Sequence, residues 1–340
     1  MNNQSKLFRK VNEIILFDDN MIESAKECFQ DYVEKGIILT TNFEENKWET
    51  TNEYSNVSFI FNLNKFQYKR FYEQVFQLSF DDFVTYLKSF IVLSMEHHVL
   101  ITLQAFLRDI KKLVRELKVN EAFSLANMKI SNPSVCIDFL STLPCLESNE
   151  LTQLIEQLDE LLNVSYQLNT KKQRKLAQFQ SYFLFNDILN DYWVKSLLDE
   201  ERLFYYPLYL WWQITAVVPL RPREFLLTQR NCLTEKDGKY YLTLRRNNLK
   251  GKDKGVSHKI SEDYYLTTYE VPFKLASEIL NYLELTKDLS STQLDTLFVT
   301  DSHYRKWKRI ASTKNRFLTY SNLNTILKYF FNFKCDKFHN

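Results

Sequence analysis

Residues 214–233 read ITAVVPLRPREFLLTQRNCL, and this stretch decides how the rest of the chain is organised. An apolar helix end runs into Pro219, and an apolar turn resumes after the polar residues that follow. Pro222 suits the first position of a helix, where its missing N–H would have no partner in any case. Arg221 then stands at the helix start, with Glu224 three residues later on the same side. The stretch fits two interpretations: a structural Arg–Glu pair between helices, or an arginine that grips a phosphate through two hydrogen bonds.

The composition is that of a folded, mostly helical protein. A length of 340 residues favours two domains, each large enough for its own core. The chain is 45% hydrophobic and 25% charged, as in globular proteins. Only 4 Gly and 6 Pro occur, which excludes long glycine-rich loops and favours helix. We therefore expect a mostly α fold with a small β-sheet, of the α+β class.

Several classes of protein are excluded at this level. The five cysteines are scattered and lack a C-x-x-C motif, as expected for reduced thiols in the cytoplasm, and they indicate no metal site. The N-terminal residues MNNQSKLFRK contain no apolar signal core. The longest apolar runs, 90–107 and 206–220, are interrupted or too short to span a bilayer. We expect a soluble, cytoplasmic protein without a membrane segment or cofactor.

Helix signals dominate the first half of the chain. Asp18 predicts the cap of a helix that continues to about Glu34 and stops at Gly36. Residues 40–58 are polar and predict a loop, and Ser79 resembles the start of a capping box.

The clearest periodicity lies in residues 99–117. Apolar side chains keep strict three-and-four spacing on one face, which predicts an amphipathic helix. The other face carries Arg108, Lys111, Lys112, Arg115 and Lys118 against Asp109 and Glu116. Such a face is usually just solvated, but it can also follow a phosphate backbone.

A basic connector, KKQRK at residues 171–175, follows a predicted helix at 148–168 and marks the expected domain boundary. We expect an N-terminal helical and loop region at 1–74, a helical domain at 75–170 and a further domain at 171–340. Beyond the connector, we expect aromatic-rich helices at 176–217, a strand at 239–245, an extended segment at 256–271, and helices starting at Pro272 and Ser321.

Basic residues are concentrated in two parts of the second half. Residues 221–259 contain eleven Lys and Arg against four Asp and Glu, a net of +7 in a chain whose total is +2. Residues 303–316 contain six Lys and Arg and no acidic residue. Clusters of this size suit a phosphate backbone, and chance clustering is the alternative. The residues we expect to contact DNA, here and on the helix at 99–117, are Arg223, Arg245, Arg246, Lys252, Lys254, Arg305, Lys306, Lys308, Arg309, Lys111, Lys112 and Arg115.

The order of these features resembles the tyrosine recombinase, or phage integrase, family over residues 75–340. The family's first signature reads roughly G-L-R-x-x-E-L-x-x-L, and this chain has PLRPREF at residues 219–225. The resemblance implies a helical core-binding domain followed by the first half of a catalytic domain, the two clamping double-stranded DNA for site-specific integration, as mobile elements use. It also implies that Arg221 is one of two phosphate-gripping arginines, that Glu224 orients the arginine region, and that Lys250, or else Lys252, is the general acid.

The chemistry of DNA strand exchange suits these roles. Attack of a tyrosine hydroxyl on a phosphodiester builds negative charge on the non-bridging oxygens, and preorganised arginines stabilise that charge. The departing deoxyribose oxygen needs a proton, which a lysine can supply.

The chain also departs from the family pattern. Pro219 replaces the signature glycine, and H-x-x-R does not occur; the nearest match, His303-x-x-Lys306, comes too early. Tyr320 and Tyr329 lie where the family has a helix ahead of that signature, so we interpret them as packing residues. We expect the N-terminal part of a recombinase, cut before H-x-x-R and the nucleophilic tyrosine. Such a part binds DNA without cleaving it, and the full-length protein would form a synaptic tetramer. The alternatives are a non-catalytic DNA-binding module on the same scaffold and a helical interaction protein.

Overall fold

The computed structural model describes residues 17–54, 56–118, 124–144, 148–171, 178–195, 199–247, 255–289, 295–300 and 317–333. The chain divides into two compact units, which are described separately. The first comprises residues 1–51, 56–175 and 255–258, and the second comprises residues 52–55, 176–254 and 259–340.

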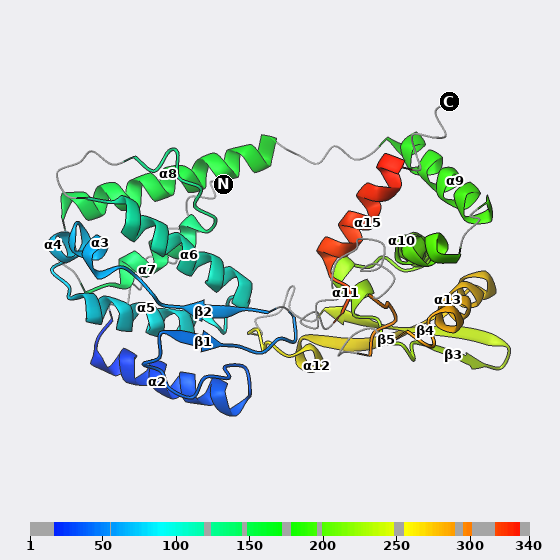
Figure 1. Ribbon diagram of the computed structural model, residues 1–340, viewed down its shortest axis with the longest axis horizontal. Coiled ribbons are helices and arrows are strands. Elements are labelled where there is room, and N and C mark those ends of the chain that lie inside the picture. The colour runs from blue at the N-terminus through cyan, green and yellow to red at the C-terminus, as the bar shows by residue number, and fades with distance from the viewer. Residues whose placement is uncertain are drawn as a thin grey trace, which may run out of the picture. The chain divides into compact units, whose positions relative to one another are not determined.

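The first unit consists of helices and one short hairpin (Figure 1). Its elements are α2 (Asp19–Glu34), β1 (Lys47–Glu49), β2 (Ser58–Ile60), α3 (Lys65–Lys69), α4 (Tyr72–Phe76), α5 (Phe80–Ser94), α6 (Leu100–Glu116), α7 (Pro133–Thr142) and α8 (Asn149–Lys171). Side chains that begin several of these helices confirm the sequence signals. Asp18 Oδ1 accepts a hydrogen bond from Met21 N at 2.8 Å, and Ser79 Oγ accepts one from Asp82 N at 3.1 Å.

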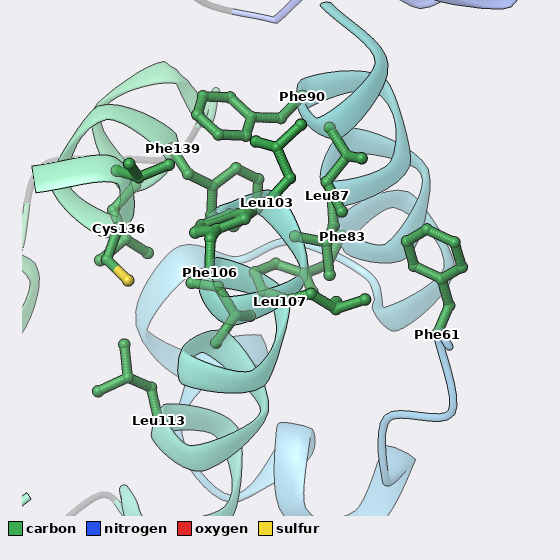
Figure 2. Packing of buried hydrophobic residues seen from close by; sticks show 14 of the residues in the cluster. Phe61, Phe83, Leu87, Phe90, Leu103, Phe106, Leu107, Leu113, Cys136 and Phe139 are labelled. Carbon is green, nitrogen blue, oxygen red and sulfur yellow. The ribbon is translucent and has the colours of Figure 1, made fainter. Parts of the chain in front are cut away.

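Aromatic rings from three helices meet in the core of this unit. Phe90 of α5, Phe106 of α6 and Phe139 of α7 have ring centroids 5.2 to 5.7 Å apart (Figure 2). Edge-to-face and tilted contacts at this spacing are favourable, because the electropositive edge of one ring meets the electronegative face of another. The core cluster continues from Phe17 to Leu158, so the regions expected separately at 1–74 and 75–170 share one core.

Strand β1 lies inside the stretch 40–58, for which the sequence predicts a loop, and β2 begins at the last residue of that stretch. Trp48 pairs with Phe59 in the antiparallel register, and both side chains are fully buried. The Trp48 ring lies 4.8 Å from the Phe29 ring and 4.7 Å from the Phe61 ring. Each strand has three residues with one inward side chain, too few to produce a detectable alternation among the Thr, Asn and Glu residues around it.

Helix α6 confirms the predicted amphipathic helix but corrects its polar face. Asp109, expected on the solvated side, is fully buried. Its carboxylate accepts hydrogen bonds from Ser131 N at 2.8 Å, Asn132 N at 3.0 Å and Lys112 Nζ at 3.2 Å. Asp109 therefore fixes the turn that leads into α7, and this turn approaches α6 on the side that the sequence left to solvent.

The second unit combines helices with a three-stranded antiparallel sheet in the order β3-β4-β5 (Figure 1). Its elements are α9 (Phe179–Lys195), α10 (Asp199–Val217), α11 (Pro222–Leu226), β3 (Leu233–Lys236), β4 (Lys239–Asn247), α12 (Ile260–Asp263), β5 (Tyr264–Val271), α13 (Phe273–Leu285) and α15 (Tyr320–Phe333). Leu242 and Leu244 of β4 are buried against the core formed with α10, α13 and α15. The small antiparallel sheets and the many helices confirm the α+β class.

The sheet follows the predicted alternation with one difference. The strand expected at 239–245 is β4, and the segment expected to be extended over 256–271 contains the four-residue helix α12 before β5 begins at Tyr264. The N–H of Ile260, the first residue of α12, donates to Glu53 Oε2 at 2.6 Å. A contact with a residue so distant along the chain cannot be read from local sequence pattern.

Candidate nucleic-acid interface

The predicted helix start at Pro222 is present. Arg221 has the extended backbone of a cap residue, with φ of −78° and ψ of 147°, and Pro222 is the first residue of α11. Arg221 N donates to Glu224 Oε2 at 2.9 Å. A carboxylate in the first turn that accepts from the cap N–H is one half of a capping box. The sequence RPRE therefore sets both the start of the helix and the position of Glu224.

Glu224 joins α11 to the end of β4. Its side chain is 3% exposed, and Oε1 accepts a hydrogen bond from Asn247 N at 2.9 Å. With Arg221 N on the other oxygen, each carboxylate oxygen holds a backbone N–H. The guanidinium groups of Arg221 and Arg246 lie 3.7 and 3.8 Å from the carboxylate, which is ion-pair rather than hydrogen-bond distance. Glu224 thus links the start of α11 to the last residue of β4.

The Arg221 guanidinium lies at the surface. Its side chain is 50% exposed, and within the described ranges it forms the ion pair with Glu224 and no hydrogen bond. A structural Arg–Glu pair would normally be bidentate and short. Here the carboxylate attracts the guanidinium electrostatically while its oxygens are occupied by backbone donors. The N–H donors of Arg221 are therefore accessible to an anion from solvent.

Arg223 is also exposed, and its guanidinium lies over an aromatic ring. Its guanidinium carbon lies 5.5 Å from the centroid of the Tyr54 ring. The Tyr54 hydroxyl donates to Asp263 Oδ2 at 2.7 Å. Burial and this hydrogen bond raise the pKa of Tyr54 well above its ordinary value, so the phenol stays protonated. No local signal in the polar stretch around Tyr54 indicates this role.

Two other arginines that we expected to contact DNA hold the backbone around α11. Arg246 Nη1 donates to Pro219 O at 2.8 Å, before the helix, and Arg245 Nη1 donates to Leu227 O at 2.8 Å, after it. Burial lowers the pKa of Arg245 from its usual value. Arg245 and Arg246 therefore fix the position of α11 on the sheet, and we assign them this structural role first.

Arg230 is a further anchoring residue that the sequence did not distinguish from the rest of the basic segment. Its guanidinium donates to Leu297 O at 3.2 Å, Leu283 O at 3.3 Å and Thr286 Oγ1 at 2.9 Å. These acceptors fix the end of α13 to the segment around Leu297. Part of the +7 charge of residues 221–259 therefore serves the fold rather than the surface.

The basic face of α6, in the first unit, is also partly engaged. Lys111 Nζ donates to Asn62 Oδ1 at 2.7 Å, and burial lowers the pKa of Lys111. Lys112 Nζ donates to Lys129 O at 2.6 Å as well as to Asp109. Arg115 is exposed and pairs with Glu116 at 2.6 Å. Of these three expected contacts, Arg115 is the most exposed.

Several expected site residues lie outside the described residues: Lys250, Lys252, Lys254, Arg305, Lys306, Lys308 and Arg309. Of the two tyrosines interpreted as packing residues, Tyr329 is partly buried, with its ring 6.0 Å from that of Phe204. Tyr320 differs from this interpretation, because it is 55% exposed at the first position of α15.

No family model, curated protein or solved structure matches this chain. The similarity to tyrosine recombinases therefore rests on the residues and their order alone. Among the described residues, no helix combines the length and the apolar character needed to cross a bilayer.

Proposed function

We propose that the second unit binds double-stranded DNA and that Arg221 grips a phosphate of its backbone, as in a tyrosine recombinase. The observation that carries the proposal is that each carboxylate oxygen of the buried Glu224 accepts a backbone N–H. This arrangement fixes the backbone of Arg221 and leaves its side chain half exposed, two residues before the exposed Arg223. A guanidinium matches phosphate geometry through paired N–H donors, and a phosphate is the anion best suited to two neighbouring arginines.

In the recombinase reaction, the arginines of this site would stabilise negative charge and would not transfer protons. Arg221 would bind a non-bridging oxygen, where negative charge builds as the phosphodiester is attacked. Glu224 would hold the arginine in position, and Lys250 or Lys252 would protonate the leaving oxygen. H-x-x-R, which supplies the second arginine in that family, does not occur in these 340 residues. We therefore propose that this chain binds DNA without cleaving it, and that strand exchange and a synaptic tetramer require residues it lacks.

The proposed location is the cytoplasm, where DNA is accessible in a cell without a nucleus. The described cysteines, Cys28, Cys136 and Cys232, are free thiols. Burial raises the pKa of Cys232 to about 12, so this thiol stays protonated and unreactive. Buried reduced thiols of this kind suit a reducing compartment.

The Arg221→Ala variant tests the proposed grip. We expect about tenfold weaker binding to a fluorescent duplex, because a charge-assisted hydrogen bond contributes about 1.5 kcal/mol or more. The magnitude of the slope of log K against log salt should also fall by about one, the change expected when one phosphate contact is lost. Fluorescence anisotropy across a salt series measures both quantities.

Lys274→Ala is the matched control, because Lys274 is exposed in the same unit, on α13. This variant should keep the affinity and the slope of the wild-type chain. Arg221→Lys keeps the charge but not the planar donor pair, so it should bind with intermediate affinity. Wild-type affinity and slope in Arg221→Ala would contradict the assignment.

An exposed aromatic surface on α9 favours a second candidate, the binding of a protein partner. Phe179 is 77% exposed and Phe183 48% exposed, with ring centroids 4.6 Å apart. Exposed apolar side chains that contact one another mark interaction sites more often than scattered ones do. A Phe179→Ser, Phe183→Ser variant that binds DNA like the wild type would show that this surface and the arginine site are independent.

A further inference from the structure

The tripeptide Asn52-Glu53-Tyr54 connects strands of the first unit in sequence but packs within the second unit. Glu53 Oε2 accepts the hydrogen bond from Ile260 N at 2.6 Å, and Tyr54 donates to Asp263 at 2.7 Å. These two contacts fix the tripeptide to the two ends of α12. The position of the Tyr54 ring is therefore set by the hydrogen bond of the preceding residue and by that of its own hydroxyl.

The Tyr54 ring also completes a small apolar cluster next to α11. It packs against buried residues of that cluster, and its centroid lies 6.3 Å from that of Tyr264. The cluster includes Leu227, the residue at the C-terminal end of α11. The buried members are Leu227, Ile260, Tyr264 and Phe317. A ring held by this cluster and by Asp263 has little freedom to rotate away.

Arg223 lies over the face of this ring, at 5.5 Å from guanidinium carbon to ring centroid. A cation–π contact uses the charge of a guanidinium rather than its hydrogen-bond donors, so the N–H groups of Arg223 can still bind another acceptor. Arg223 follows Arg221 by two residues, on the first turn of α11. The ring therefore restricts the rotamers of an exposed arginine beside the phosphate-binding Arg221.

We propose that Tyr54 is a positioning residue of the arginine site, which orders Arg223 through a cation–π contact so that it binds the DNA backbone together with Arg221. The inference rests on the proposed function and adds to it a residue from a distant part of the sequence. An arginine that is already ordered loses less conformational entropy when it binds a phosphate. Loss of the ring should therefore weaken DNA binding through Arg223 alone.

A double-mutant cycle on DNA affinity tests this coupling. Tyr54→Leu should weaken duplex binding about two- to fivefold, the change that corresponds to an exposed cation–π contact. Tyr54→Phe keeps the ring and should stay within about twofold of the wild type. On an Arg223→Ala background, Tyr54→Leu should produce no further loss. Tyr320→Leu, at an exposed tyrosine elsewhere in the second unit, is the control and should bind like the wild type.

A second measurement does not depend on DNA. The Nε–Hε NMR signal of Arg223, assigned by its loss in Arg223→Lys, should show an upfield ring-current shift in the wild-type chain. The shift should persist in Tyr54→Phe and disappear in Tyr54→Leu. This comparison remains decisive if Tyr54→Leu folds poorly, because Tyr54→Phe and the wild type still report the stack.

Each outcome has a distinct meaning. No ring-current shift in the wild type, or additive losses in the double-mutant cycle, would overturn the role of Tyr54 while leaving the proposed function intact. A wild-type chain that shows the shift but fails to bind DNA would overturn the proposed function, and with it the role of Tyr54 toward DNA. The shift together with non-additive losses would support both.

Discussion

Glu224→Ala should destabilise the second unit by about 2–4 kcal/mol and abolish the arginine site. The substitution removes the carboxylate that accepts hydrogen bonds from two backbone N–H groups, those of Arg221 and Asn247. It also removes the negative charge that lies 3.7 Å from the Arg221 guanidinium and 3.8 Å from the Arg246 guanidinium. Native-state hydrogen exchange in peptides that cover α11 and β4 measures the local loss of stability.

Glu270→Ala is the matched control for that substitution. Glu270 of β5 forms an ion pair with Lys239 of β4 at 3.0 Å, so it too links two elements of the second unit. Both of these side chains, however, are more than half exposed. Exposed pairs contribute little because water and salt screen them. This variant should leave exchange around α11 unchanged. Equal protection of α11 in Glu224→Ala and the wild type would show that the carboxylate does not hold the site together.

Asp109→Ala should destabilise the first unit by about 3–5 kcal/mol. The carboxylate is fully buried and accepts three hydrogen bonds, from Ser131 N, Asn132 N and Lys112 Nζ. Its removal takes the acceptor from two backbone donors at the entrance to α7, and it leaves the ammonium group of Lys112 with its hydrogen bond to Lys129 O but without its counter-ion. We expect faster exchange in α7 peptides and a lower urea midpoint for this unit.

Asp109→Asn should have a smaller effect, because its carbonyl oxygen can still accept from the backbone although it no longer attracts Lys112. Glu116→Ala, at an exposed position of the same helix, should change stability by no more than about 0.5 kcal/mol. If Asp109→Ala matched Glu116→Ala, the buried network would not contribute to the stability of this unit.

Much of the fold could be predicted from local patterns. Three local signals predicted their elements: the three-and-four apolar spacing of α6, the cap residues Asp18 and Ser79, and the alternation in β4. Each of these signals depends on residues that are close together in the sequence. The β1–β2 hairpin escaped prediction because its strands are short and depend on Trp48 packing into a core made by distant helices. The burial of Asp109 escaped because it depends on the turn before α7, not on α6 itself.

The candidate site divides in the same way. The helix start at Pro222 and the placement of Glu224 beside Arg221 follow from spacing within one turn, and both were predictable. The use of Arg245 and Arg246 for backbone carbonyls was not, because charge counting cannot separate surface cations from cations that hold the chain. Tyr54 was beyond local reasoning altogether, since its partner Asp263 lies 209 residues further along the chain.

The most direct test of the central claim is a salt titration of duplex DNA binding by the unmodified 340-residue chain. We expect measurable binding of a duplex of about 30 base pairs at about 50 mM salt. The logarithm of the association constant should fall linearly with the logarithm of the salt concentration, with a slope of several units. If log K did not change with log salt, DNA binding would not depend on contacts with phosphates, and the proposed arginine–phosphate contact would be wrong. No binding at low salt would contradict the proposed function outright.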